Sequence, residues 1–198
     1  MEYIKELLEK FRFEMDGMAF NNNDKNRLSA ALFDISLDHS RAIIKLLDAE
    51  NPNCPSAYAL VRPMFECFLR ASWIFDCSSI SEIECIKKQD KFPLSYEKML
   101  LAVEKSNQWP ETLTQAFNRG KNNLHSFTHG GMQLVSRRFE GNFLIHNIDQ
   151  DEIQDLIKFI VLISFMSFIG IVRVSETNEK NFFIEQTFHE IIKRYIKS

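Results

Sequence analysis

The sequence predicts an all-α fold, a single multi-helix bundle that spans residues 1–198 and contains about six long helices. Three observations support this. Apolar residues recur at helical spacing along most of the chain. The chain has only 6 Gly and 5 Pro and no long alternating apolar–polar run, so strand signals are weak. With 198 residues and 45% hydrophobic content, it can bury one complete core.

The first two helices follow from apolar stripes. The polar run 21–24 ends the first helix and can cap the second, which extends to about Glu50. The first stripe consists of Ile4, Leu7, Leu8, Phe11, Met15 and Met18. The second consists of Leu28, Ala31, Leu32, Ile35, Ala42, Ile43 and Leu46.

The break at 51–55 starts a third helix, 56–77, which is apolar nearly all round and therefore interior. Two shorter, peripheral helices follow at 80–88 and 94–105. Pro110 fits the first turn of the next helix, which Gly130-Gly131 stops or kinks before the chain continues through Arg138.

Residues 141–147 are predicted to be a connector. Asp149 followed by Glu152 resembles a capping box and opens a long helix to about Val174; a last helix spans 179–197. The stretch 159–172 carries no charge, but its 14 residues fall short of the roughly 18 to 20 that a membrane span needs. We therefore expect the central helix of the bundle there and no membrane partner.

Charge, cysteine spacing and the first residues of the chain limit the classes of function that we expect. A net charge of −3 gives no global sign of nucleic-acid binding, so any such role needs a local basic patch. The four cysteines lack C-x-x-C or zinc-finger spacing, and we expect no cofactor. The first residues form an amphipathic charged helix rather than a signal peptide, which predicts a cytoplasmic protein with reduced cysteines.

Polar residues on apolar faces are the strongest functional signal, since burying them requires partners. Arg62 and Glu66 share a face of the third helix, which Arg70 continues. They form either a structural ion pair or the lining of a cleft. His39 lies on the apolar stripe of the second helix; it is either a buried, hydrogen-bonded histidine or a residue of the same cleft.

The segment from Arg119 to Arg138 is locally basic. No Asp or Glu occurs in 112–139, which contains Arg119, Lys121, Arg137 and Arg138. If the helix continues, one face carries uncharged hydrogen-bonding groups, whereas an ordinary solvated face is rich in Lys and Glu. These groups are Asn122, His125, Ser126, His129 and Gln133. A surface or capping role is the alternative.

Two chemistries use such residues. Metal binding by His125 and His129 lacks the Glu of H-E-x-x-H, and nothing selects a third ligand among Glu66, His39 and His146, so no metal is assigned. Metal-independent RNA cleavage needs a histidine for proton transfer and Arg or Lys for the developing charge, and this segment supplies both.

The run from Arg119 to His125 resembles the R-x(4–6)-H motif of HEPN-type nucleases, with Gly120 where that family usually has a polar residue. The resemblance implies a HEPN-like helical bundle, metal-independent RNA cleavage and a homodimer. The chain also resembles an uncharacterised bacterial helical family, which is similar to abortive-infection proteins. The motifs that carry this resemblance are V-R-P-x-x-E and S-F-T-H-x-G…R-R. The matching positions are Arg62, Glu66, Ser126, Thr128, His129, Gly130, Arg137 and Arg138; they favour His129 over His125.

We therefore expect a metal-independent endoribonuclease or RNA-binding protein of a phage-defence or toxin–antitoxin system. Its partners would be RNA, a second copy and an antitoxin or defence protein. The catalytic candidates are His129, His125 and Arg119. The substrate-binding candidates are Arg62, Glu66, Asn122, Ser126, Gln133, Arg137 and Arg138. The alternative is a non-catalytic module that binds a small ligand, nucleotide or protein in the same cleft.

Overall fold

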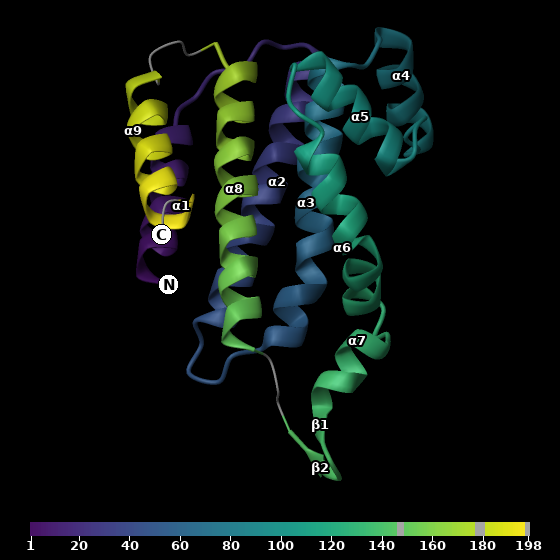
Figure 1. The fold of residues 1–198 in the computed structure, drawn as a ribbon. Coiled ribbons are helices and arrows are strands. Elements are labelled where there is room, and N and C mark those ends of the chain that lie inside the picture. Colours follow the sequence, from purple (N-terminus) through teal and green to yellow (C-terminus); the bar gives the residue numbers. More distant parts are fainter. Residues whose placement is uncertain (146–148, 177–180, 197–198) are drawn as a thin grey trace.

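The computed structural model describes residues 1–145, 149–176 and 181–196, without the side chains of residues 116, 119–124, 181, 182 and 196. The protein is mostly helical (77%) and has a small two-stranded sheet, which confirms the predicted all-α class (Figure 1). The helices are α1 (Glu2–Met15), α2 (Asp24–Leu47), α3 (Cys54–Asp76), α4 (Ile80–Gln89), α5 (Tyr96–Ser106), α6 (Thr112–Thr128), α7 (Met132–Val135), α8 (Gln150–Val174) and α9 (Asn181–Ile191).

Shorter elements complete the chain. A 3-10 turn (Ser136–Arg138) follows α7, strands β1 (Phe139–Glu140) and β2 (Phe143–Leu144) pair antiparallel, and a π turn (Ile192–Ile196) follows α9. In the described part of the chain, five of the nine α-helices have 14 residues or more, so the expected count of about six long helices is not confirmed.

The hairpin corrects the prediction of a connector at 141–147. Gly141 and Asn142 join the strands, and Gly141 has a positive φ of 58°. A two-residue turn with glycine first and φ above zero is a common hairpin turn because its twist matches that of the strands. The dipeptide Gly141-Asn142 was therefore the overlooked signal.

Helix starts follow local capping chemistry. The side chain of Asn23 accepts the N–H of Asn26 at 2.8 Å, as the polar run predicted. Ser79 and Glu82 form a capping box on α4. Asp149 caps α8 through the N–H of Asp151, but the expected capping box with Glu152 is wrong, because the carboxylate of Glu152 binds Arg137 instead.

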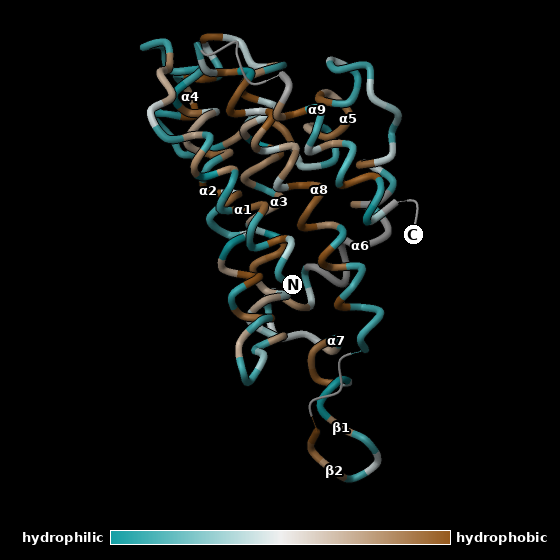
Figure 2. The backbone as a smooth tube through the Cα atoms, turned by 90° about the vertical axis from the view of Figure 1, so that its left-hand side faces the viewer, coloured by the Kyte–Doolittle hydropathy of each residue, from teal (hydrophilic) through white to brown (hydrophobic). Residues whose placement is uncertain are grey.

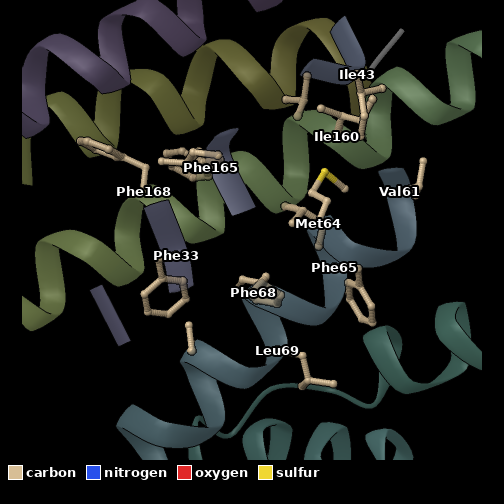
Figure 3. Close-up of a cluster of buried hydrophobic side chains, with 14 of the residues drawn as sticks. Phe33, Ile43, Val61, Met64, Phe65, Phe68, Leu69, Ile160, Phe165 and Phe168 are labelled. Carbon is tan, nitrogen blue, oxygen red and sulfur yellow. The ribbon is translucent and has the colours of Figure 1, made fainter. Parts of the chain in front are cut away.

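The core lies between α2, α3 and α8, which run side by side through the bundle (Figure 1). Phe33 from α2, Phe68 from α3 and Phe168 from α8 are all nearly inaccessible to solvent (Figure 3). Phe11 of α1 stacks on Phe168 with ring centroids 4.6 Å apart, and Phe183 of α9 meets the same ring edge-on. These contacts place α1 and α9 against the face of α8, opposite α6 (Figure 1).

Helices α3 and α8 contain the largest sets of buried residues, as predicted. By length and composition α8 could cross a membrane, but 67% of its most apolar window is buried inside the protein. Packing against the neighbouring helices therefore accounts for its apolar character, as expected of the bundle's central helix.

Gly170 of α8 leaves room for the Phe33 ring of α2. A Cβ atom there would lie 2.4 Å from Cζ of Phe33, whose ring is buried. We predict that Gly170→Ala lowers the unfolding free energy by about 1–3 kcal/mol, since overpacking outweighs the better helix propensity of Ala, about 1 kcal/mol. Urea unfolding measures the change.

The control is the pair Phe33→Leu and Phe33→Leu/Gly170→Ala. Because the shorter side chain of leucine frees the space, Gly170→Ala should lower the unfolding free energy by clearly less in the protein that already carries Phe33→Leu. If Gly170→Ala lowers the unfolding free energy equally with and without Phe33→Leu, the proposed clash with the Phe33 ring is contradicted.

Candidate functional site

One polar face interrupts the apolar surface of α3. Arg62 and Glu66 pair as predicted, with Nε of Arg62 donating to Oε1 of Glu66 at 2.7 Å. Their side chains are 29% and 17% exposed, so water screens this pair only partly. One turn further on, Nη2 of Arg70 lies 3.9 Å from Oε2 of Glu66. The carboxylate of Glu66 thus lies between two guanidinium groups.

The last turn of α6 brings two histidines to this face. Nη1 of Arg62 lies 3.1 Å from Nδ1 of His125, and the His125 and His129 rings are 4.6 Å apart between centroids. A guanidinium can only donate hydrogen bonds, so Nδ1 of His125 must accept. In the neutral form of the ring, this contact places the proton on Nε2. Both histidines are exposed and can meet a ligand.

Tyr96, at the start of α5, joins the other end of this face. Its hydroxyl accepts a hydrogen bond from Nη2 of Arg70 at 2.6 Å. Burial raises the pKa of Tyr96, and its hydrogen bond to Glu66 adds to this rise, so the phenol keeps its proton. We call the linked residues Arg62, Glu66, Arg70, Tyr96, His125 and His129 the polar cluster.

Glu104 positions α6 and was not identified from the sequence. Its carboxylate is buried and accepts hydrogen bonds from the backbone N–H of Leu113 and of Thr114, at 2.8 and 3.1 Å, and from the Thr114 hydroxyl at 2.5 Å. These groups lie in the first turn of α6, so Glu104 caps that helix from α5. An acidic residue on the buried face of α5 was the available signal.

The Gly130-Gly131 pair ends α6 directly after the histidines. Gly130 has a positive φ of 69°, and a Cβ atom at Gly131 would lie 2.4 Å from Oγ of Ser126. The chain turns back on itself, and the N–H of Gln133 donates to Oγ of Ser126 at 3.0 Å. The expectation that Gln133 extends the face of His125 and His129 is therefore wrong, because α6 does not continue past His129.

Arg137 is held by α8. Its Nη2 and Nε atoms bind the two carboxylate oxygens of Glu152 at 2.6 and 3.1 Å, and Nη1 binds the side-chain oxygen of Gln133 at 2.8 Å. Its guanidinium also lies over the ring of Phe127, which stacks on Tyr58. Ser126, Gln133 and Arg137 thus tie α6 and α7 to α8, while the stacked rings of Phe127 and Tyr58 link α6 to α3. Within the described residues, no hydrogen bond or ion pair joins Arg137 to the polar cluster.

The other candidate site residues predicted from the sequence either lie apart from the polar cluster or fall outside the residues that the structure describes. Arg138 lies near Cys54: burial raises the pKa of that thiol and the charge of Arg138 opposes the rise. His39 is half-buried on α2, which lowers its pKa, and within the described residues no hydrogen bond connects it to Arg62. The side chains of Arg119 and Asn122, and all of His146, lie outside the described residues.

The sequence model of DUF6988, described as a family of unknown function, matches residues 33–195. The chain belongs to the DUF6988 family. The matched range covers every residue of the polar cluster. Neither a curated protein nor a solved structure matches the chain.

A surface pocket adjoins the polar cluster of this DUF6988 protein. Arg70 and Tyr96 belong to both, and Lys91, Phe92 and Ser95 add a cation, an aromatic ring and a hydroxyl. The acidic residues Asp90 and Glu97 also line the pocket. In the described ranges, no group of three or more His, Cys, Asp and Glu side chains could hold a metal ion.

The hydrogen bond from Arg62 predicts the tautomer of His125. In neutral solution the unprotonated ring should carry its proton on Nε2, because Nδ1 accepts from Arg62. Nitrogen-15 NMR of the imidazole rings distinguishes the two forms. Arg62→Met should shift His125 toward a mixture of tautomers.

His189 of α9 is the matched control for this experiment. Its Nδ1 lies 2.8 Å from the carbonyl oxygen of Glu185, which can only accept, so the neutral ring should carry its proton on Nδ1. Arg62→Met should leave His189 unchanged. A His125 ring protonated on Nδ1 in the unsubstituted protein would rule out the proposed contact.

Glu104→Ala should lower the unfolding free energy by about 3 kcal/mol or more, because three donors at the buried start of α6 lose their acceptor. Glu111→Ala is the control: this exposed residue precedes α6 without a side-chain capping bond, and its change should stay within about 0.5 kcal/mol. Equal effects on urea unfolding would show that Glu104 does not anchor α6.

Proposed function

We propose that the chain binds RNA at the polar cluster and cleaves it without a metal ion. The observation that supports this most is the contact between Arg62 and His125, with His129 packed against the same imidazole. Two exposed histidines beside an arginine are the groups that proton transfer to and from a phosphodiester requires.

The hydrogen bonds suggest how the roles divide. His125 already accepts a hydrogen bond at Nδ1, so its Nε2–H is available as a donor to a phosphate oxygen. His129 then takes the proton from the ribose 2′-hydroxyl. The 2′-oxygen forms a bond to phosphorus while the bond to the 5′-oxygen breaks, and water protonates the departing oxygen. The products are a 2′,3′-cyclic phosphate and a 5′-hydroxyl.

Glu66 acts on the position of Arg62 rather than on substrate, since its carboxylate is bound by guanidinium groups on both sides. Arg119 and Asn122 keep their proposed roles at the phosphate because they precede His125 on the same helix. Arg137 is not assigned a role at the phosphate, because its bidentate contact with Glu152 already neutralises its charge.

The same proposal includes a HEPN-like bundle and a cytoplasmic role in bacterial phage defence or a toxin–antitoxin pair. Its support is the R-x(4–6)-H spacing of Arg119 and His125 within a helical bundle, at the end of α6. The regulatory partner would be an antitoxin or another defence protein.

A non-catalytic ligand-binding module is the second candidate, and the pocket beside Arg70 favours it. Phe92 and Tyr96 provide flat rings there, and Lys91 and Arg70 provide cations beside the carboxylates of Asp90 and Glu97, a combination that suits a small ligand with a planar ring, such as the base of a nucleotide. In this alternative the histidines bind without transferring protons.

We expect the purified protein to cut a mixed-sequence RNA in the presence of EDTA and to leave 2′,3′-cyclic phosphate ends. His129→Ala should lower the rate about 100-fold or more, the usual effect of losing a general acid or base. His189→Ala is the control, because that exposed histidine lies on α9, away from the cluster (Figure 1).

Other outcomes separate the candidates. An absence of cleavage, combined with thermal stabilisation by nucleotides that Arg70→Met abolishes, would favour the ligand-binding module. Cleavage that EDTA abolishes and zinc restores would instead require a metal held by His125 and His129.

A further inference from the structure

An unusual set of apolar side chains is exposed on α7 and the hairpin. The hairpin projects from one end of the bundle (Figure 1), and apolar residues continue through α7 and β2 (Figure 2). The exposed side chains are Met132 (71%), Val135 (43%), Phe139 (53%), Phe143 (76%) and Leu144 (73%). An isolated two-stranded hairpin is marginally stable, and a contiguous exposed apolar patch marks an interaction site.

The hairpin also has an open backbone edge. The N–H of Ile145 donates to the carbonyl of Arg138 at 2.8 Å, while Phe139 lies opposite Leu144 and Glu140 opposite Phe143. In an antiparallel ladder this makes Phe139 and Leu144 the non-hydrogen-bonded pair. Their N–H and C=O groups therefore point away from the hairpin, and in the described chain no other strand pairs with either edge.

We propose that a second copy of this chain pairs with the hairpin along β1. A two-fold axis through the Phe139 pair would let the two residues exchange both of their outward hydrogen bonds. Antiparallel pairing about that axis sets Arg138 of each copy opposite Glu140 of the other. Opposite charges then face each other at both ends of the contact, whereas most edge strands carry charges that repel a second copy.

The polar apex of the hairpin argues against a membrane as the partner. Gly141 and Asn142 form the turn, Glu140 and Phe143 lie opposite each other beside it, and the other exposed apolar side chains lie further along the flanks. A membrane-inserting loop would place apolar residues at the tip, because the tip enters the lipid first. The flanks instead suit a contact beside the hairpin, in which Phe139, Val135 and Met132 pack against their counterparts.

The contact is small. Residues 132–145 provide fewer positions than the roughly 20–30 per side of a standard interface, so we expect a weak dimer that dissociates on dilution. The dimer does not depend on RNA cleavage, because no residue of the polar cluster takes part in it.

Sedimentation velocity across about 1–300 μM tests the proposal on the full chain. The protein should convert from monomer to dimer in this range, and Phe139→Lys should weaken association at least tenfold. Phe13→Lys is the control, because Phe13 is also an exposed phenylalanine (79%, against 53% for Phe139) but lies on α1. Circular dichroism melts confirm that each variant is folded.

A charge exchange identifies the partner as a second copy. Glu140→Arg should weaken the dimer at least tenfold, since it places Arg opposite Arg138, and Arg138→Glu/Glu140→Arg should restore association. A protein that stays monomeric at 300 μM overturns the proposal, as does a dimer unaffected by Phe139→Lys. Binding to phosphatidylcholine–phosphatidylglycerol vesicles by a protein that remains monomeric would likewise overturn it.

Discussion

The polar cluster depends on one constraint: the largely buried helix α3 carries a charged pair. Arg62 and Glu66 lie on α3, whose neighbouring positions Val61 and Phe65 are buried. Partly buried charges need hydrogen-bonding partners, and one ion pair does not use all the donors of a guanidinium. Helices α5 and α6, which pack on α3, therefore have to present polar groups there, and Tyr96 and His125 meet this need.

Local patterns predicted the helical class and the pairing of Arg62 with Glu66. Both follow from spacing within one helix: apolar residues three and four apart mark a buried face, and residues four apart meet on the same face. The same reasoning correctly placed α3 and α8 at the centre, because each is apolar nearly all round. The hairpin was missed because its strands have only two residues each, too few to show alternation.

Contacts between distant segments were not predictable in this way. The segment 112–139 contains no acidic residue, yet Glu152, well outside that window, binds Arg137. The choice of His125 rather than His129 as the partner of Arg62 depends on how far α6 is rotated about its axis, and Glu104 of α5 helps to fix that. The sequence identified the candidate residues, but only the three-dimensional arrangement shows which of them contact one another.

The bidentate contact between Arg137 and Glu152 lies at the base of the projecting hairpin. Glu152 lies in the first turn of the long central helix, and Arg137 lies just before the first strand. The ion pair therefore fixes the base of the hairpin to α8. This contact thus lies between the hairpin and the stretch that runs back through α7 and two glycines to His129.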